Sequence, residues 1–275
     1  MLDEDTAVSE ALLYKKAGGR TIVDATTIGI GRDPLALARI ARATGLNIVM
    51  GAGYYVDAVH PQEMDELTDT DIANQMVEEI TVGVGDTGVK AGIIGELGCS
   101  WPLTENERKV LRAGAQAQRR TGVAVLIHPG RDHQAPFEIL DVLAAAGADL
   151  GRVIMGHLDR TISDVGVLMD LAQSGCYLEY DLFGYESSFY PLSDFAMPND
   201  AQRMDFIQLL IDEGYTDRVV IAHDICSKHR LAKYGGHGYN HILQNIVPRM
   251  RRRGFSEEQI CSIISLNPAR ALAFI

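Results

Sequence analysis

Long apolar runs and positive charge are both scarce in this sequence. No apolar run reaches the ~18 residues that a membrane-spanning helix needs, and the N-terminus, MLDEDTAVSEALL, lacks the basic and apolar regions of a signal peptide. The formal net charge is −12, and a surface of that sign repels nucleic acids and anionic membranes. We therefore expect a cytoplasmic protein whose partners include neither nucleic acid nor membrane.

Paired cysteines and the common nucleotide and serine-hydrolase motifs are lacking too. The four cysteines form no Cys-x-x-Cys pair, which argues against a disulfide framework and a structural zinc knuckle. The sequence contains no G-x-x-x-x-G-K-[S/T] phosphate loop and no G-x-S-x-G nucleophile elbow. A single G-x-G-x-x-G at 83–88 precedes a strand pattern instead of following one, which is the wrong order for dinucleotide binding.

What the sequence does contain is a regular alternation of strand and helix patterns. Helical patterns with apolar spacings of three and four separate the strand-like runs, and one of them begins with a capping box, Thr104 to Glu107. Seven apolar, β-branched runs occur, at 20–27, 46–53, 90–96, 123–130, 152–157, 176–181 and 218–223. Such strands predict a parallel sheet covered by helices, either an eight-stranded (β/α) barrel or a doubly wound sheet. No linker splits the chain, so we expect one domain, 1–275.

Four of these runs end in side chains that commonly bind metals. Glu96, His128, His157 and Asp224 each lie at or just after the carboxyl end of a predicted strand, where barrel enzymes place their chemistry. Imidazole and carboxylate ligands together suit zinc, manganese, iron or cobalt. The pattern therefore predicts a shared metal site that activates a hydroxide, with Asp224 as both ligand and proton acceptor.

Other residues near these strand ends are candidates for substrate contact. Arg131 follows His128 and could bind a substrate anion through its guanidinium fork, although a surface salt bridge would suit it as well. His237 lies in a glycine-rich loop after the last strand and is a candidate to contact substrate. Tyr54 and Tyr55 directly follow the second run and would either line the pocket or pack in the core.

Two further residues are candidates to orient a metal ligand without binding the metal themselves. Asp159 and Arg160 follow His157 directly, in the motif GHLDRT. Metal-bound histidines usually donate their second ring N–H to a neighbouring acceptor. We therefore expect Asp159 and Arg160 to orient the His157 ring.

Several motifs together resemble one known family. GIIGELGCSWPLTENERKVL, IHPGR, GHLDRT, GCYLEYDLFG, AHDI and KYGGHGYNHI are similar to those of the phosphotriesterase-related proteins, in the phosphotriesterase-like branch of the amidohydrolase superfamily. The resemblance implies a (β/α)8 TIM-type barrel with two divalent metals, usually zinc. It also implies that Glu96 bridges the metals, that His128 and His157 bind the more exposed one, and that Asp224 is the proton shuttle.

The sequence departs from this family in one respect. The first strand of the family carries His-x-His, whose two-residue spacing puts both rings on one face, and this chain contains no such motif. We therefore expect seven of the eight barrel strands, an N-terminally incomplete barrel, and one tightly bound Zn²⁺ or none in place of two. A non-catalytic binding protein or a fragment is the alternative.

The resemblance also suggests a substrate. Relatives hydrolyse phosphotriesters, lactones and N-acylated amino acids or amino-sulfonates. Because Arg131 could hold an anionic tail, we expect hydrolysis of a small N-acyl substrate such as N-acetyltaurine. A lactone or a phosphotriester is the alternative, and a homo-oligomer is an option that the sequence leaves open.

Overall fold

The computed structural model describes residues 3–187, 189–192 and 196–274. Within these residues one sheet is formed by seven strands, each paired in parallel with its neighbour in the order of the chain. The strands are β1 (Thr21–Asp24), β2 (Asn47–Ala52), β3 (Ile93–Gly98), β4 (Val125–His128), β5 (Val153–Met155), β6 (Tyr177–Tyr180) and β7 (Val219–Ile221).

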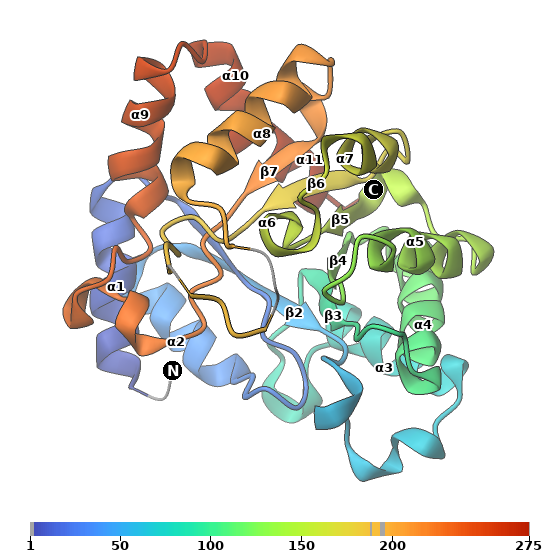
Figure 1. Ribbon diagram of the computed structural model, residues 1–275. Coiled ribbons are helices and arrows are strands. Elements are labelled where there is room, and N and C mark those ends of the chain that lie inside the picture. Colours follow the sequence, from blue (N-terminus) through green and yellow to red (C-terminus); the bar gives the residue numbers. More distant parts are fainter. Residues whose placement is uncertain (1–2, 188, 193–195, 275) are drawn as a thin grey trace.

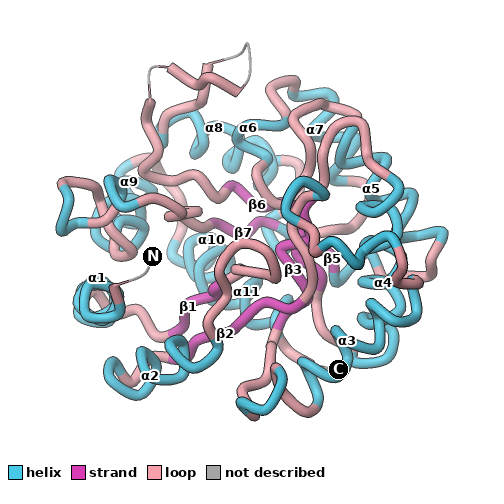
Figure 2. Tube along the Cα trace, turned by 90° about the horizontal axis from the view of Figure 1, so that it is seen from below, coloured by secondary structure: helices cyan, strands magenta, loops and turns pink. Residues whose placement is uncertain are grey.

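Helices surround this sheet. Figure 2 shows the strands in the middle of the molecule and the helices on the outside. The α-helices are α1 (Glu4–Lys16), α2 (Pro34–Thr44), α3 (Asp69–Thr81), α4 (Glu105–Thr121), α5 (Ala135–Ala145), α6 (Leu158–Thr161), α7 (Val165–Ala172), α8 (Asp200–Asp212), α9 (Val247–Arg252), α10 (Glu257–Cys261) and α11 (Asn267–Leu272). π-Helical turns, η8 (Ile242–Ile246) and η9 (Ser262–Leu266), precede α9 and α11. In the described part of the chain, every helix is too short or too polar to cross a membrane.

The sheet confirms the parallel arrangement that the apolar runs predict. All residues of β4 and β5 are buried, as expected for strands covered on both faces. Residues such as Ile94, Ile127 and Leu178 form the core together with buried side chains of the helices. These helices lie around the outside of the sheet (Figure 1). In the described residues the strand order does not reverse, as it would at the switch point of a doubly wound sheet. The fold is therefore an α/β half-barrel.

Strand β3 differs from the prediction in a way that matters for Glu96. The strand extends two residues beyond Glu96, to Gly98, and its register against β4 shifts between Ile94 and Leu97. Gly95 has a φ of 115°, and a Cβ there would lie 2.2 Å from the Leu126 carbonyl oxygen. Because only glycine tolerates this conformation and this approach, Gly95 permits the irregularity that directs the Glu96 side chain.

A buried carboxylate fixes the loops at this end of the sheet. The capping box at the start of α4 is present, and Glu107 within it is 0 % exposed. The Glu107 carboxylate accepts hydrogen bonds from the backbone N–H groups of Asp57 (3.1 Å) and Ser100 (2.9 Å) and from the Ser100 hydroxyl (2.8 Å). The loops after β2 and β3 are therefore tied to α4, and both border the predicted site.

Candidate metal centre

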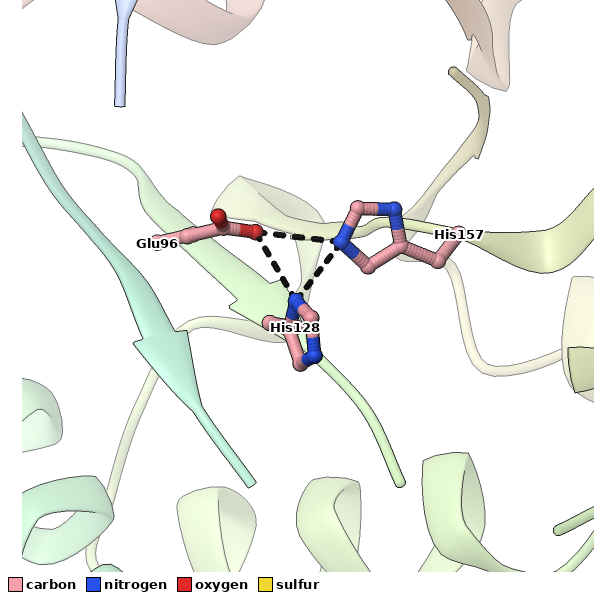
Figure 3. A group of neighbouring side chains, drawn as sticks. All are labelled: Glu96, His128 and His157. Atoms are coloured by element: carbon pink, nitrogen blue, oxygen red, sulfur yellow. Dashed lines mark hydrogen bonds and ion pairs between the residues drawn. The ribbon is translucent and has the colours of Figure 1, made fainter. Parts of the chain in front are cut away.

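Three of the four predicted ligands meet at the carboxyl end of the sheet. Glu96 Oε2 lies 3.2 Å from His128 Nδ1 and 3.1 Å from His157 Nε2, and these two nitrogens are 2.7 Å apart. Figure 3 shows the three side chains pointing toward one another from different parts of the sheet. The Glu96 carboxylate, in the carboxyl-terminal half of β3, is thus paired with two imidazoles.

Backbone geometry turns His157 and Asp224 toward this end of the molecule. His157 follows β5 with a φ of 55°, and Asp224 follows β7 with a φ of 45°. In the described residues these are the two non-glycine positions with positive φ, a conformation that costs energy for such side chains and is concentrated at functional sites. Both are residues that the sequence pattern had singled out.

A carboxylate that the sequence reading did not single out supports His157. The Asp181 carboxylate accepts hydrogen bonds from His157 Nδ1 (2.8 Å) and from the His157 backbone N–H (2.8 Å). Asp181 directly follows β6, so its position after a strand was a signal that could have identified it. The Asp159 carboxylate lies one step further out, where it accepts the Asp181 backbone N–H at 2.8 Å.

Different groups support His128. Arg160 Nη2 lies 3.1 Å from His128 Nε2 and also donates to the Pro129 carbonyl oxygen at 3.1 Å. The Tyr55 hydroxyl lies 3.0 Å from His128 Nδ1, with the two rings edge to face. Arg160 therefore contacts His128, where the sequence had suggested His157.

Burial and mutual contact set the charges in the cluster. Burial opposes ionisation of Glu96, but its contacts with His128 and His157 outweigh burial and hold the Glu96 pKa below its usual range. Burial lowers the pKa of His128 to about 3. Burial also acts to lower the pKa of His157, but the neighbouring Asp181 carboxylate raises it overall. The cluster therefore has an ionised carboxylate beside a neutral His128.

Asp224 stands apart from the other three predicted ligands. Burial raises its pKa to about 7, with the charges of Asp181 and Glu96 adding to the effect. Its backbone carbonyl accepts a hydrogen bond from Arg230 Nη1 at 2.5 Å. Asp224 is therefore a half-buried carboxyl group whose pKa lies well above that of an ordinary aspartate.

The remaining predicted residues have the following contacts. Arg131 Nε donates to the Tyr190 hydroxyl at 2.7 Å. The Tyr54 side chain is buried and its hydroxyl donates to Gln75 of α3, so it packs in the core. His237 is exposed and stacks on His241, with ring centroids 4.2 Å apart.

The donor set fits a divalent metal. Ligand atoms around a tetrahedral zinc, each at about 2.0–2.2 Å, are separated by about 3.3 Å. The three contacts of 2.7–3.2 Å between Glu96, His128 and His157 would need to open only slightly. One oxygen and two nitrogens are also a common catalytic ligand set, which leaves a coordination position for water or substrate.

Comparisons with known proteins agree with this geometry. The model of the phosphotriesterase family matches residues 3–272. An N-acetyltaurine hydrolase of Homo sapiens is 51% identical over 273 residues, which cover 98% of this chain and 78% of that protein. The corresponding protein of Dictyostelium discoideum is 50% identical over 272 residues, covering 98% and 74%. A crystal structure of a resiniferatoxin-binding protein from Rhodobacter sphaeroides superposes with a TM-score of 0.94 at 37% identity, covering 98% of this chain and 75% of that one.

The half-barrel, its Glu–His–His cluster and these relatives define the protein as a metal-dependent hydrolase. The chain belongs to the phosphotriesterase family. The resemblance found in the sequence motifs is therefore confirmed, and the enzyme interpretation holds over that of a non-catalytic binding protein.

Proposed function

We propose that this protein hydrolyses the amide bond of a small N-acyl substrate with an anionic tail, with N-acetyltaurine as the first candidate, and that zinc is its metal. The observation that carries the proposal is the convergence of Glu96, His128 and His157 at the carboxyl end of a parallel sheet. The named activity of relatives about half identical to this chain supports the choice of substrate.

The proposed roles follow from the contacts. Glu96, His128 and His157 would hold the metal, which when bound would polarise the carbonyl and activate water. Asp224, whose pKa burial raises to about 7, is a further ligand, accepts the proton of the attacking water and passes it to the leaving amine. Tyr55 borders the site through its contact with His128.

The anionic tail of the substrate is proposed to bind Arg131, with His237 bordering the substrate. Among the described residues no carboxylate forms an ion pair with Arg131, whose hydrogen-bond partner is the Tyr190 hydroxyl. A guanidinium without a carboxylate partner can offer two parallel N–H groups to a sulfonate.

We further infer a single domain over residues 1–275 that an eighth strand completes as a TIM-type barrel. β1 and β7 are the edge strands of the described sheet. The unpaired backbone N–H and C=O groups of an edge strand can pair with a further strand. A strand with His-x-His placed there would add two imidazoles that could bind a second metal.

Acetate release from N-acetyltaurine, followed by NMR, tests the proposal. The zinc-loaded chain is assayed as it stands and with an N-terminal strand carrying His-x-His, and a neutral lactone serves as the comparison substrate. We expect acetate release that is faster with the strand, and preference for N-acetyltaurine over the lactone. If both forms bind zinc and neither releases acetate, the proposed substrate is wrong.

A further inference from the structure

A series of buried charged groups connects His157 to the loop that carries His237. Its members lie just after β6, on α6 and α8, and just before η8. Each is at most 4 % exposed, and they are Asp181, Asp159, Arg203, Asp200 and His241. Such a set of titratable groups in the interior requires explanation, because burying charge is costly.

The first half of the series leads outward from His157. Asp181 binds the ring and backbone of His157, and its own backbone N–H donates to Asp159 Oδ2 at 2.8 Å. The other oxygen of Asp159 accepts a hydrogen bond from Arg203 Nε at 2.5 Å. Hydrogen bonds therefore connect Arg203 to His157 through Asp159 and Asp181.

The second half of the series leads from Arg203 to the loop that carries His237. Arg203 Nη1 donates to Asp200 Oδ1 at 2.8 Å, and Asp200 Oδ2 lies 2.7 Å from His241 Nε2. The ring of His237 stacks on that of His241, with an angle of 22° between the planes. The third arm of the guanidinium, Nη2, donates to the Tyr185 carbonyl oxygen at 3.0 Å.

A contribution to folding stability alone does not explain why Arg203 is buried as a charged residue. A buried ion pair or triad can often be replaced by apolar side chains without loss of stability, yet Arg203 is 0 % exposed between two carboxylates. Its planar fork fixes the directions of its donors. A single rigid group therefore sets the position of Asp159 on α6 relative to Asp200 on α8.

We propose that Arg203 is a positioning residue that holds His157, through Asp159 and Asp181, and the His237 loop, through Asp200 and His241, in one arrangement suited to catalysis. This inference rests on the proposed function, because it assumes that His157 binds metal and that the loop contacts substrate. It predicts that a change at Arg203 acts on metal affinity and on substrate affinity together.

The variant Arg203→Lys tests this directly, because lysine keeps the charge but cannot reach both carboxylates with a planar fork. Metal affinity is measured by Co²⁺ titration against a competing chelator, and KM by acetate release from N-acetyltaurine. We expect Co²⁺ affinity to fall about tenfold or more and KM to rise severalfold. Asp159→Asn should affect chiefly Co²⁺ affinity, and Asp200→Asn chiefly KM.

Arg32→Lys is the matched control. Arg32 forms a similarly buried pair with Glu79, with side chains 6% and 7% exposed, outside the series. It should lower the Tm and leave Co²⁺ affinity unchanged. If Arg203→Lys lowers the Tm in the same way while Co²⁺ affinity and KM match wild type, Arg203 is merely structural and the inference is wrong.

Three further experimental results would test the role proposed for Arg203. If Arg203→Lys fails to fold, the two asparagine variants decide, and the inference is overturned if neither changes Co²⁺ affinity or KM. A wild-type protein that binds no Co²⁺ overturns the proposed metal centre and this inference together. A wild-type protein that binds Co²⁺, with variants that bind it equally well and show unchanged KM, overturns this inference alone.

Discussion

The Asp181 carboxylate binds His157 at two points, accepting the ring Nδ1–H at 2.8 Å and the backbone N–H at 2.8 Å. Because an ionised carboxylate only accepts hydrogen bonds, Nδ1 must carry a proton. This leaves Nε2 as the nitrogen that faces Glu96 and His128. The pair has the form of the carboxylate–histidine contacts that orient metal ligands.

Asp181→Asn should therefore weaken metal binding without abolishing it. Loss of the charged acceptor weakens the hold on the His157 ring, and such outer contacts are typically worth about 10–100-fold in metal affinity. Zn²⁺ affinity measured against a chelator checks this. Asp164→Asn, which changes the exposed cap of α7 to another good capping residue, should leave it unchanged.

His128→Asn should remove most of the bound metal, because it deletes one of the three proposed ligands that converge in Figure 3. Metal content after dialysis, measured by mass spectrometry, checks this. His133→Asn is the control, since His133 lies in the loop after β4 and its ring accepts a hydrogen bond from the Ser163 backbone N–H. Equal metal content in the two variants would remove His128 from the site.

Asp224→Asn should lower kcat while most of the metal remains. Asparagine cannot accept the proton of the attacking water, and loss of a general base typically costs about 10²–10⁴-fold. Steady-state hydrolysis of N-acetyltaurine, with metal content measured in parallel, checks this. A kcat near the wild-type value would show that another group accepts the proton.

Glu107→Gln should destabilise the fold. The buried carboxylate accepts hydrogen bonds from Asp57, Ser100 and Thr104, and a glutamine amide would face some of these donors with a donor of its own. We expect a loss of about 1–3 kcal/mol in the free energy of unfolding, measured by urea denaturation. Glu105→Gln, whose side chain is 89% exposed, should change it by less than about 0.5 kcal/mol.

Asp200 should contribute a pH-dependent part of the stability. Burial acts to raise its pKa, but its contacts with His241 and the Gly184 N–H outweigh burial and lower it below 3.8. A carboxyl group whose pKa is lower in the folded state stabilises the fold above its unfolded pKa, and this contribution is lost as the pH falls through the folded pKa.

The destabilisation caused by Asp200→Asn should consequently be full at neutral pH and shrink as the pH falls below about 4. Urea unfolding of wild type and variant across this range measures the difference. Asp212→Asn, at the exposed end of α8, should show no such trend. A destabilisation that stays constant down to acid pH would rule out this linkage.

Much of the fold followed from local patterns. The seven apolar runs became seven parallel strands in chain order, and the capping box at Thr104 starts α4 as predicted. Strand β3 was placed three residues too early at its start, at 90 instead of Ile93. Local periodicity cannot place a register shift, because the shift depends on how Gly95 packs against Leu126 of the neighbouring strand.

The supporting contacts of the site were predicted less well. Asp159 and Arg160 were chosen as neighbours of His157 in the sequence, but the direct partner of His157 is Asp181, and Arg160 turns to His128. Tyr54 points into the core while Tyr55 faces the site. These outcomes depend on side-chain direction at the ends of strands, where the backbone leaves the regular alternation.

The sequence by itself determined which elements form and which ligand-type side chains stand at the ends of strands, because hydrophobic periodicity and turn residues act over a few neighbouring positions. The tertiary structure alone decided which of those side chains meet. Glu96, His128 and His157 come together because parallel strands bring their carboxyl ends to one edge of the sheet. Arg203 is far from His157 in the chain. The packing of α8 brings its guanidinium to Asp159 of α6 and to the Tyr185 carbonyl oxygen in the loop after β6.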